Sequence, residues 1–338
     1  MARRSQGLRR LWGFLAALIL GVAGAAGLVA WWLQQPLPLA GPSAELSIEP
    51  GTSPRDVAQA WVDAGVQTSP ALLYQWFKWS GQAPKIRAGS YEIEAGTSPR
   101  RLLAKMVQGE ETLERVRFIE GWTLRQLRAA LAKAPNLKPL TSGMADAQLM
   151  AAVGAPGVPA EGRFFPDTYI YSRGVSDLTV LKRAYQAMQR RLASVWSEKP
   201  ADSPLKTMDE ALILASIIEK ETGAAADRAL VAGVFINRLR LGMPLQTDPT
   251  VIYGLGDAFD GNLRKRDLLA DTPYNTYTRG GLPPTPISLP GMASLRAAVR
   301  PEPTKALYFV ARGDGTSAFS DNLADHNRAV NKYQRGGH

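Results

Sequence analysis

The stretch TMDEALILASIIEKETG, residues 207–223, predicts a buried helix that ends in acidic residues. Its eight central residues, Ala211–Ile218, include one polar side chain, Ser216. A helix that is apolar on every side is buried in the protein. Thr207 and Glu210 have the spacing of a capping box, and Gly223 suits the position just past a helix end. We therefore expect a core helix over about 208–222.

Glu219 stands at the end of this apolar helix, where we expect a low dielectric. Burial disfavours the charged form of a carboxyl group, and a group that keeps its proton near neutral pH can act as a general acid. Glu219 and Glu221 are two positions apart, so their side chains point about 200° apart and cannot face one another. Ser216 and Thr222 share the face of Glu219, and this polar line is expected to border a cleft. The alternative is that both glutamates are solvated at a frayed helix end.

Two loops that follow this helix contain the residue types of a sugar-binding cleft. They are LGMPLQTDPTVIYGLG, residues 241–256, and DTPYNTYTRGGLPPTPISLPG, residues 271–291. Aromatic rings cover the apolar faces of sugars, while amides and hydroxyls bond their polar groups. The same residues are also ordinary turn residues, but long loops without secondary structure favour function. The candidate substrate-binding residues are Gln246, Thr247, Asp248, Tyr274, Asn275 and Tyr277.

The N-terminus predicts a membrane anchor. Residues 11–33 carry no charge and form about 34 Å of helix, which is enough to cross a bilayer. Arginines fill the preceding tail, residues 1–10, so the positive-inside rule places that tail in the cytoplasm and the rest of the chain outside. Trp31 and Trp32 close the span, as at a membrane interface. A cleaved signal peptide is the alternative, because Ala23–Ala26 offers small residues.

The exported part is expected to be α+β, with a small module followed by a mixed α/β domain. Residues 34–44 are Pro-rich and indicate a linker. IEPGTSPR, residues 48–55, recurs as IEAGTSPR, residues 93–100, and more loosely as IEGWTLR, residues 119–125. Each copy predicts a strand that ends before a capped helix. The strand–helix–helix–strand order over residues 45–112 is similar to a LysM-type glycan-binding module, and residues 113–338 form the second domain.

Composition excludes several kinds of site. The chain of 338 residues has no cysteine and two histidines, which leaves no thiolate nucleophile and no usual zinc site. We therefore expect neither metal nor cofactor. The net charge of +10 suggests anionic partners. Nucleic acid is not expected among them, since the predicted topology places the domains outside the cell.

Several segments together resemble one known family. They are EGRFFPDTYIY, ASIIEKETG, VFINRLRLGMPLQTDPTVIYGLG, PYNTYTRGGLPPTPISLPG and ALYFVARGDGTSAFSDNLADHN, in that order. This set is similar to the YceG-like family, the endolytic murein transglycosylases. The resemblance covers nearly the whole exported region and implies a LysM-like module before a catalytic domain.

The resemblance also implies an activity and a catalytic residue. It implies cleavage of the MurNAc-β-1,4-GlcNAc bond within peptidoglycan strands to leave 1,6-anhydro-MurNAc ends. Glu219 matches the family's catalytic glutamate and would serve first as acid and then as base. The expected partners are glycan strands, the membrane and peptidoglycan synthases, with the enzyme acting on nascent strands at the bacterial inner membrane.

Two alternatives stay open at this point. A true hydrolase would pair Glu219 with a second carboxylate, Asp248 or Glu161. A non-catalytic peptidoglycan-binding scaffold would use the repeat module, and Glu219 would be incidental. Glu161 and Asn327 are weaker candidates for holding the sugar, whereas Asp167, Arg238 and Arg240 are expected to be structural.

Overall fold

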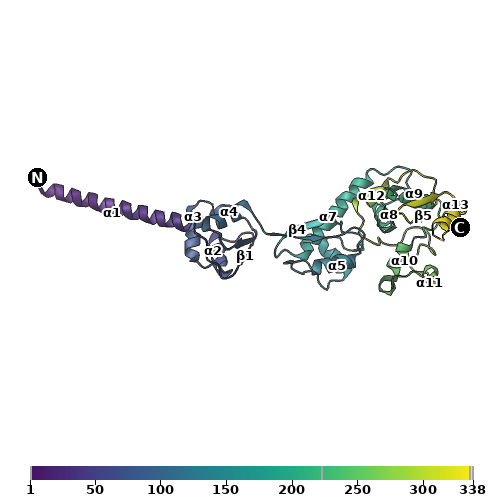
Figure 1. The fold of residues 1–338 in the computed structure, drawn as a ribbon, viewed down its shortest axis with the longest axis horizontal. Helices are drawn as coiled ribbons and strands as arrows, with labels where there is room; N and C mark the ends of the chain where they lie inside the picture. Colours follow the sequence, from purple (N-terminus) through teal and green to yellow (C-terminus); the bar gives the residue numbers. More distant parts are fainter. Residues whose placement is uncertain (1, 222–223, 335, 337–338) are drawn as a thin grey trace. The chain divides into compact units, whose positions relative to one another are not determined.

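The computed structural model describes residues 2–221, 224–334 and 336. It divides into two compact units, Met1–Glu114 with Tyr171–Gly174, and Arg115–Ile170 with Val175–His338. Helix α1 (Ala2–Trp32) is the first element of the first unit (Figure 1). Its segment Trp12–Trp32 has a mean hydropathy of 2.2 and is long and apolar enough to cross a membrane.

The first unit has the expected strand–helix–helix–strand order. Its elements are β1 (Ser43–Ile48), α2 (Pro54–Asp63), α3 (Pro70–Trp79), a 3-10 turn at Ala83–Lys85, β2 (Gly89–Glu94) and α4 (Pro99–Gln108). β1 and β2 pair antiparallel, with Ser43 opposite Glu94 and Ile48 opposite Gly89. Trp61 and Phe77 of the two middle helices are fully buried against this pair.

The repeated sequence motif works as a helix-capping device. The side chains of Ser53 and Ser98 accept hydrogen bonds from the backbone N–H three residues on, and proline follows each serine. Thr123 does the same in the third copy, as part of a full capping box with Gln126. One expectation fails here. Residues 34–44 are not a free linker, because Leu37 is buried in the core and its N–H donates to the carbonyl of Thr97.

The second unit is mainly helical. Its helices are α5 (Leu124–Ala132), α6 (Asp146–Val153), α7 (Asp177–Trp196), α8 (Met208–Glu221), α9 (Arg228–Arg240), α10 (Asp248–Leu255), α11 (Lys265–Leu269), α12 (Met292–Val299) and α13 (Leu323–Tyr333). Besides β1 and β2, the described residues contain two short sheets, β3 (Leu113–Arg117) with β4 (Thr168–Ser172), and β5 (Tyr308–Ala311) with β6 (Ser317–Ser320). The chain is thus a mixed α/β protein with one N-terminal apolar helix.

Helix α8 lies at the centre of this unit, as its apolar sequence predicts. It packs against α7, α9, α10 and α12 (Figure 1), and every side chain from Ala211 to Ile218 is buried. Thr207 caps it through the N–H of Glu210. The expected roles of Thr222 and Gly223 lie outside the described residues. The first expected loop contains more secondary structure than predicted, because α10 lies inside it. A further short helix, α11, lies between the two loops.

Candidate active site

Ser216 fastens the second loop to α8. Its hydroxyl accepts the N–H of Ile287 at 3.0 Å and donates to the carbonyl of Ile213. The carbonyl of Ser216 accepts the hydroxyl of Ser288. Ser216 is completely buried, so the expectation that it borders a cleft is wrong. It is instead the contact that holds the loop ahead of α12 in place.

The first loop is joined to the second by three buried threonines. The N–H of Thr247 donates to the hydroxyl of Thr276 at 3.1 Å, and the hydroxyls of Thr250 and Thr276 lie 2.8 Å apart. Gln246, just before them, has a φ of +50°. Such a backbone costs roughly 1–2 kcal/mol for a residue with a side chain. This strained turn leads into the start of α10.

Glu221 lies beside this turn. Its side chain is partly buried, and burial raises its pKa to about 7. The hydroxyl of Thr247 favours the charged form and so opposes this shift, while the charge of Asp248 adds to it. The hydroxyl of Thr247 has no partner among the described residues that meets the usual distance and angle limits of a hydrogen bond. The hydroxyl of Tyr277 donates to Asp248 at 2.6 Å. Glu221 is therefore an acid whose pKa lies well above its ordinary value, near neutral pH.

Glu219 meets a different part of the protein, as its spacing from Glu221 predicts. Its carboxylate accepts the N–H of Gly291, the residue that precedes α12, at 2.8 Å. Glu120 lies against the same glycine, because a Cβ on Gly291 would stand within van der Waals overlap of the Glu120 carboxylate. Burial and the charge of Glu219 raise the pKa of Glu120, and Arg228 opposes them. Glu219 is thus half-buried next to another carboxylate rather than among the expected sugar-binding residues.

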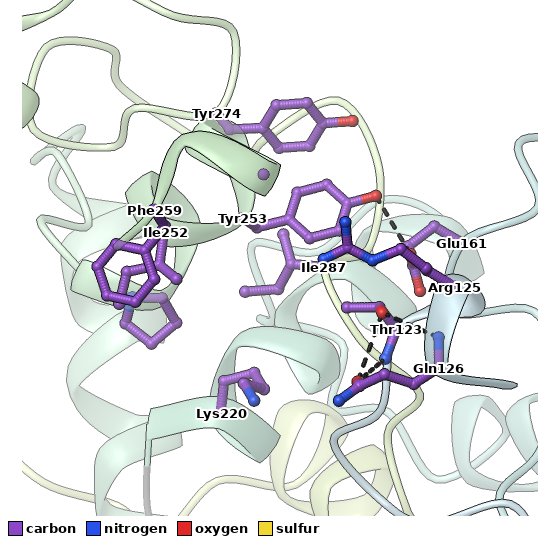
Figure 2. Close-up of a pocket in the computed structure, with 12 residues that line it drawn as sticks. Thr123, Arg125, Gln126, Glu161, Lys220, Ile252, Tyr253, Phe259, Tyr274 and Ile287 are labelled. Atoms are coloured by element: carbon purple, nitrogen blue, oxygen red, sulfur yellow. Dashed lines mark hydrogen bonds between the residues drawn. The ribbon is translucent and has the colours of Figure 1, made fainter. Parts of the chain in front are cut away.

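A cleft of about 830 Å³ opens next to the end of α8 (Figure 2). This volume lies within the range of about 300–1,000 Å³ that is usual for ligand sites. The lining combines aromatic rings, two cations and one acid; its residues are Thr123, Arg125, Gln126, Glu161, Lys220, Pro249, Ile252, Tyr253, Gly256, Phe259, Tyr274 and Ile287. Lys220 precedes Glu221, and Pro249 follows Asp248. Two lining residues are thus the chain neighbours of Glu221 and Asp248.

Glu161 is the acid that lines the cleft. Its carboxylate accepts the N–H groups of Leu124 and Gly162 at 3.0 to 3.2 Å. It also accepts the hydroxyl of Tyr253 at 3.2 Å (Figure 2). Burial raises its pKa to about 7 in spite of these three donors. Because Leu124 is the first residue of α5, Glu161 also stabilises the start of that helix. The side chain holds the cleft wall together and can carry a proton.

The structure separates the six expected binding residues. Tyr274 lines the cleft, and its hydroxyl lies 2.8 Å from that of Thr285. Asn275 is buried, and its amide donates to the carbonyls of Leu268 and Ala270, so it shapes its own loop. The others lie by Glu221 or the turn before α10: Gln246, Thr247, Asp248 and Tyr277. Their contact with substrate stays a prediction.

The residues expected to be structural do hold the fold together. Arg238 is buried and donates to the carbonyl of Leu307 at 2.7 Å. Arg240 pairs with Asp202. The carboxylate of Asp167 accepts the N–H of Thr168, and its carbonyl accepts that of Phe118. Asn327 lies on α13 and does not line the cleft.

Sequence reasoning missed several lining residues. Around Lys220, the sequence drew attention only to the two neighbouring glutamates. Nothing in the sequence near Phe259 or Ile287 distinguishes these two residues from core residues. Thr123 and Gln126 were visible only as a helix cap in the third copy of the repeated motif. Among the described residues, no group of three or more His, Cys, Asp or Glu side chains is arranged to hold a metal ion.

Comparison with known proteins gives a consistent family. The chain is 31% identical over 305 residues to the endolytic murein transglycosylase of Bacillus subtilis strain 168. The matched region covers 85% of this chain and 84% of the relative. It is 26% identical to that of Streptococcus pneumoniae strain D39, with 84% of this chain and 57% of the relative covered. A crystal structure of a yceG-like protein from Listeria monocytogenes matches with a TM-score of 0.53 and 29% identity, covering 85% of this chain and 98% of that one. The model of the YceG-like family matches residues 46–332. The chain therefore belongs to the YceG-like family.

Proposed function

We propose that this protein is an endolytic lytic transglycosylase that cleaves the MurNAc-β-1,4-GlcNAc bond within peptidoglycan strands. The named activity of its relatives supports the reaction class. The observation that carries the proposal is Glu221, a partly buried acid whose pKa burial raises to about 7, and whose chain neighbour Lys220 lines a cleft with aromatic walls. A protonated carboxyl group beside a sugar-sized cleft is what glycosidic cleavage needs.

In the proposed mechanism one carboxyl group acts twice. Protonated Glu221 donates its proton to the glycosidic oxygen, and the bond between that oxygen and C1 of the muramic residue breaks through an oxocarbenium-like transition state. The resulting carboxylate accepts the proton of the muramic C6 hydroxyl, whose oxygen attacks C1. The product ends in 1,6-anhydro-MurNAc, the acid regains its proton, and no water is consumed.

Glu219 is the other candidate for this acid. The family resemblance assigns the role to it, and it lies two residues from Glu221 on the same helix. Its carboxylate accepts the N–H of Gly291, and Glu120 lies against the same glycine. The geometry supports Glu221 better, because Thr247, Asp248 and Tyr277 gather around that residue.

Glutamine variants of the two residues distinguish Glu221 from Glu219 as the general acid. Glu221→Gln is expected to reduce release of anhydro-muropeptides from purified sacculi by about 10²- to 10⁴-fold, the usual worth of a general acid. Glu219→Gln should retain most of the activity, and Glu302→Gln, an exposed glutamate outside the cleft, should retain all of it. Circular dichroism and mass spectrometry would check folding and products. Full activity of the Glu221 variant together with loss in the Glu219 variant would assign the acid to Glu219 instead.

A hydrolase is the second candidate function. It is favoured by the protonatable acid that lines the cleft, Glu161, and by the charge of Asp248 close to Glu221. The products distinguish the reactions, since a hydrolase leaves reducing ends and a transglycosylase leaves anhydro ends. A scaffold without activity would release neither from sacculi.

We further propose where the enzyme works. The apolar helix α1 would anchor the chain in the bacterial inner membrane, with its N-terminus in the cytoplasm and both units outside. The first unit would serve as a LysM-like glycan-binding module. An anchored enzyme of this kind would trim or terminate nascent strands close to peptidoglycan synthases. Membrane fractionation with and without residues 1–33 tests the anchor.

A further inference from the structure

The cleft contains one cation that has no carboxylate partner. Arg125 forms an ion pair with Asp257. Lys220 is exposed at the end of α8, and no carboxylate of the described residues lies within 4 Å of its ammonium group. Its Nζ atom has a long contact of 3.4 Å to the carbonyl of Gly121. An ammonium group has three donors, so this contact leaves most of its hydrogen-bonding capacity open on a residue that lines the cleft.

The acid that lines the cleft does not neutralise this lysine. Glu161 is occupied by Leu124, Gly162 and Tyr253. Lys220 also follows Glu219, whose carboxylate is bonded to Gly291 instead. The cation is therefore available to a ligand.

In the proposed substrate, peptidoglycan, the anionic groups that could bind this cation are carboxylates. The sugar rings and acetamides of a glycan strand are neutral. The negative charges belong to the muramic residue, either on its lactyl carboxylate, when no peptide is attached, or on the carboxylates of its stem peptide. The proposed bond cleavage takes place at C1 of that same residue.

We propose that Lys220 is a specificity-determining residue that binds a muramic-linked carboxylate of the substrate. This inference rests on the proposed function, because it places the muramic residue in the cleft beside the acid at the end of α8. An ionised partner strengthens a hydrogen bond. The contact would orient the muramic C1 towards the acid and would favour peptidoglycan over neutral glycans such as chitin.

A simpler role for Lys220 is to stabilise the end of its helix. A cation in the last turn of a helix interacts favourably with the helix dipole and with free carbonyls. That role predicts a loss of stability that does not depend on the substrate. The binding role predicts a loss of activity that depends on the substrate carboxylate, so the two can be separated by experiment.

The test is a cycle of two enzymes and two substrates. Wild-type protein and Lys220→Met are assayed on glycan strands with free carboxylates and on the same strands after their carboxylates have been converted to amides. We expect the variant to lower kcat/KM by about ten- to hundredfold on the charged strands, mainly through KM, and to change it little on the amidated strands. Lys265→Met, an exposed lysine outside the cleft, is the charge-matched control, and Lys220→Arg should retain part of the preference.

Two further results interpret the cycle. Repeating it on peptide-free and peptide-bearing strands identifies the partner, since loss on peptide-free strands assigns it to the lactyl carboxylate and loss only on peptide-bearing strands assigns it to the stem peptide. An equal loss on charged and amidated strands would overturn the proposal and leave Lys220 as a helix-stabilising residue. If the wild type releases anhydro ends from none of these strands, the proposed function fails rather than this inference.

Discussion

At the end of α8, two glutamates separated by one lysine lie in different surroundings. Burial raises the pKa of Glu221 to about 7; the hydroxyl of Thr247 opposes this shift and the charge of Asp248 adds to it. Glu219 receives the N–H of Gly291. A rotation of about 100° per residue around the helix produces this division. The surroundings of each glutamate therefore depend on which segments pack against its side of the helix.

The raised pKa of Glu221 predicts the pH dependence of cleavage. The acid must be protonated to donate, so the rate should fall as pH rises through about 7, approaching tenfold per pH unit above it. The pH profile of kcat/KM on solubilised strands measures this limb. Asp248→Asn should move the limb to lower pH, because a neighbouring negative charge no longer raises the pKa. A limb that stays in place in that variant would contradict the assignment of Glu221.

At the scale of elements, α8 is the helix to which other segments of the candidate active site are bound. The loop before α12 is bonded to it through Ser216. The same loop pairs with the segment ahead of α5, since Gly121 donates to the carbonyl of Leu289 and Leu289 to that of Trp122. Segments from three distant parts of the sequence are thereby held around the end of one helix.

Ser216→Ala is expected to destabilise the second unit by about 1–3 kcal/mol. The change leaves the N–H of Ile287 buried without its acceptor, and an unsatisfied buried donor costs about this much. Ser294→Ala is the matched control. Ser294 is equally buried, but its hydroxyl has no hydrogen-bond partner among the described residues, so its loss should cost little. Urea unfolding of the two variants compares them, and equal midpoints would refute the role of Ser216.

At the scale of the whole molecule, the first unit is assembled from two distant pieces of chain. Tyr171–Gly174 belongs to it although more than fifty residues separate this segment from Glu114. The guanidinium of Arg173 forms ion pairs with Glu45, Glu92 and Glu114. The hydroxyl of Ser90 in β2 donates to the carbonyl of Arg173. The β-α-α-β module is therefore not complete as the continuous segment 45–112.

Arg173→Met should loosen the first unit without affecting the second. It leaves Glu45, Glu92 and Glu114 without their shared cation, and since these groups are partly exposed we expect a cost of about 1 kcal/mol. Amide hydrogen exchange in β1 and β2 should become faster. Arg100→Met, an exposed arginine of the same unit, is the control. Unchanged exchange in both strands would show that the pairs do not stabilise the unit.

Local patterns in the sequence determined the elements. The apolar run of α8, the serine and threonine caps and the long N-terminal helix follow from burial and hydrogen bonding within a few residues, and all three are present. The family resemblance added a reaction class and pointed to the end of α8. The sequence alone did not show α10 within its loop, because turn residues such as Pro249 and Gly254 conceal a short helix.

Only the tertiary structure decided the surroundings of each side chain. The pKa of Glu221, the bonds that occupy Glu161 and the unpaired ammonium of Lys220 all depend on groups that are distant in sequence. Ser216 looked like a cleft residue and is a buried fastening, since burial depends on what packs against a helix face rather than on the polarity of that face. The sequence determined which residues carry protons and charge, and packing determined which of them face the cleft.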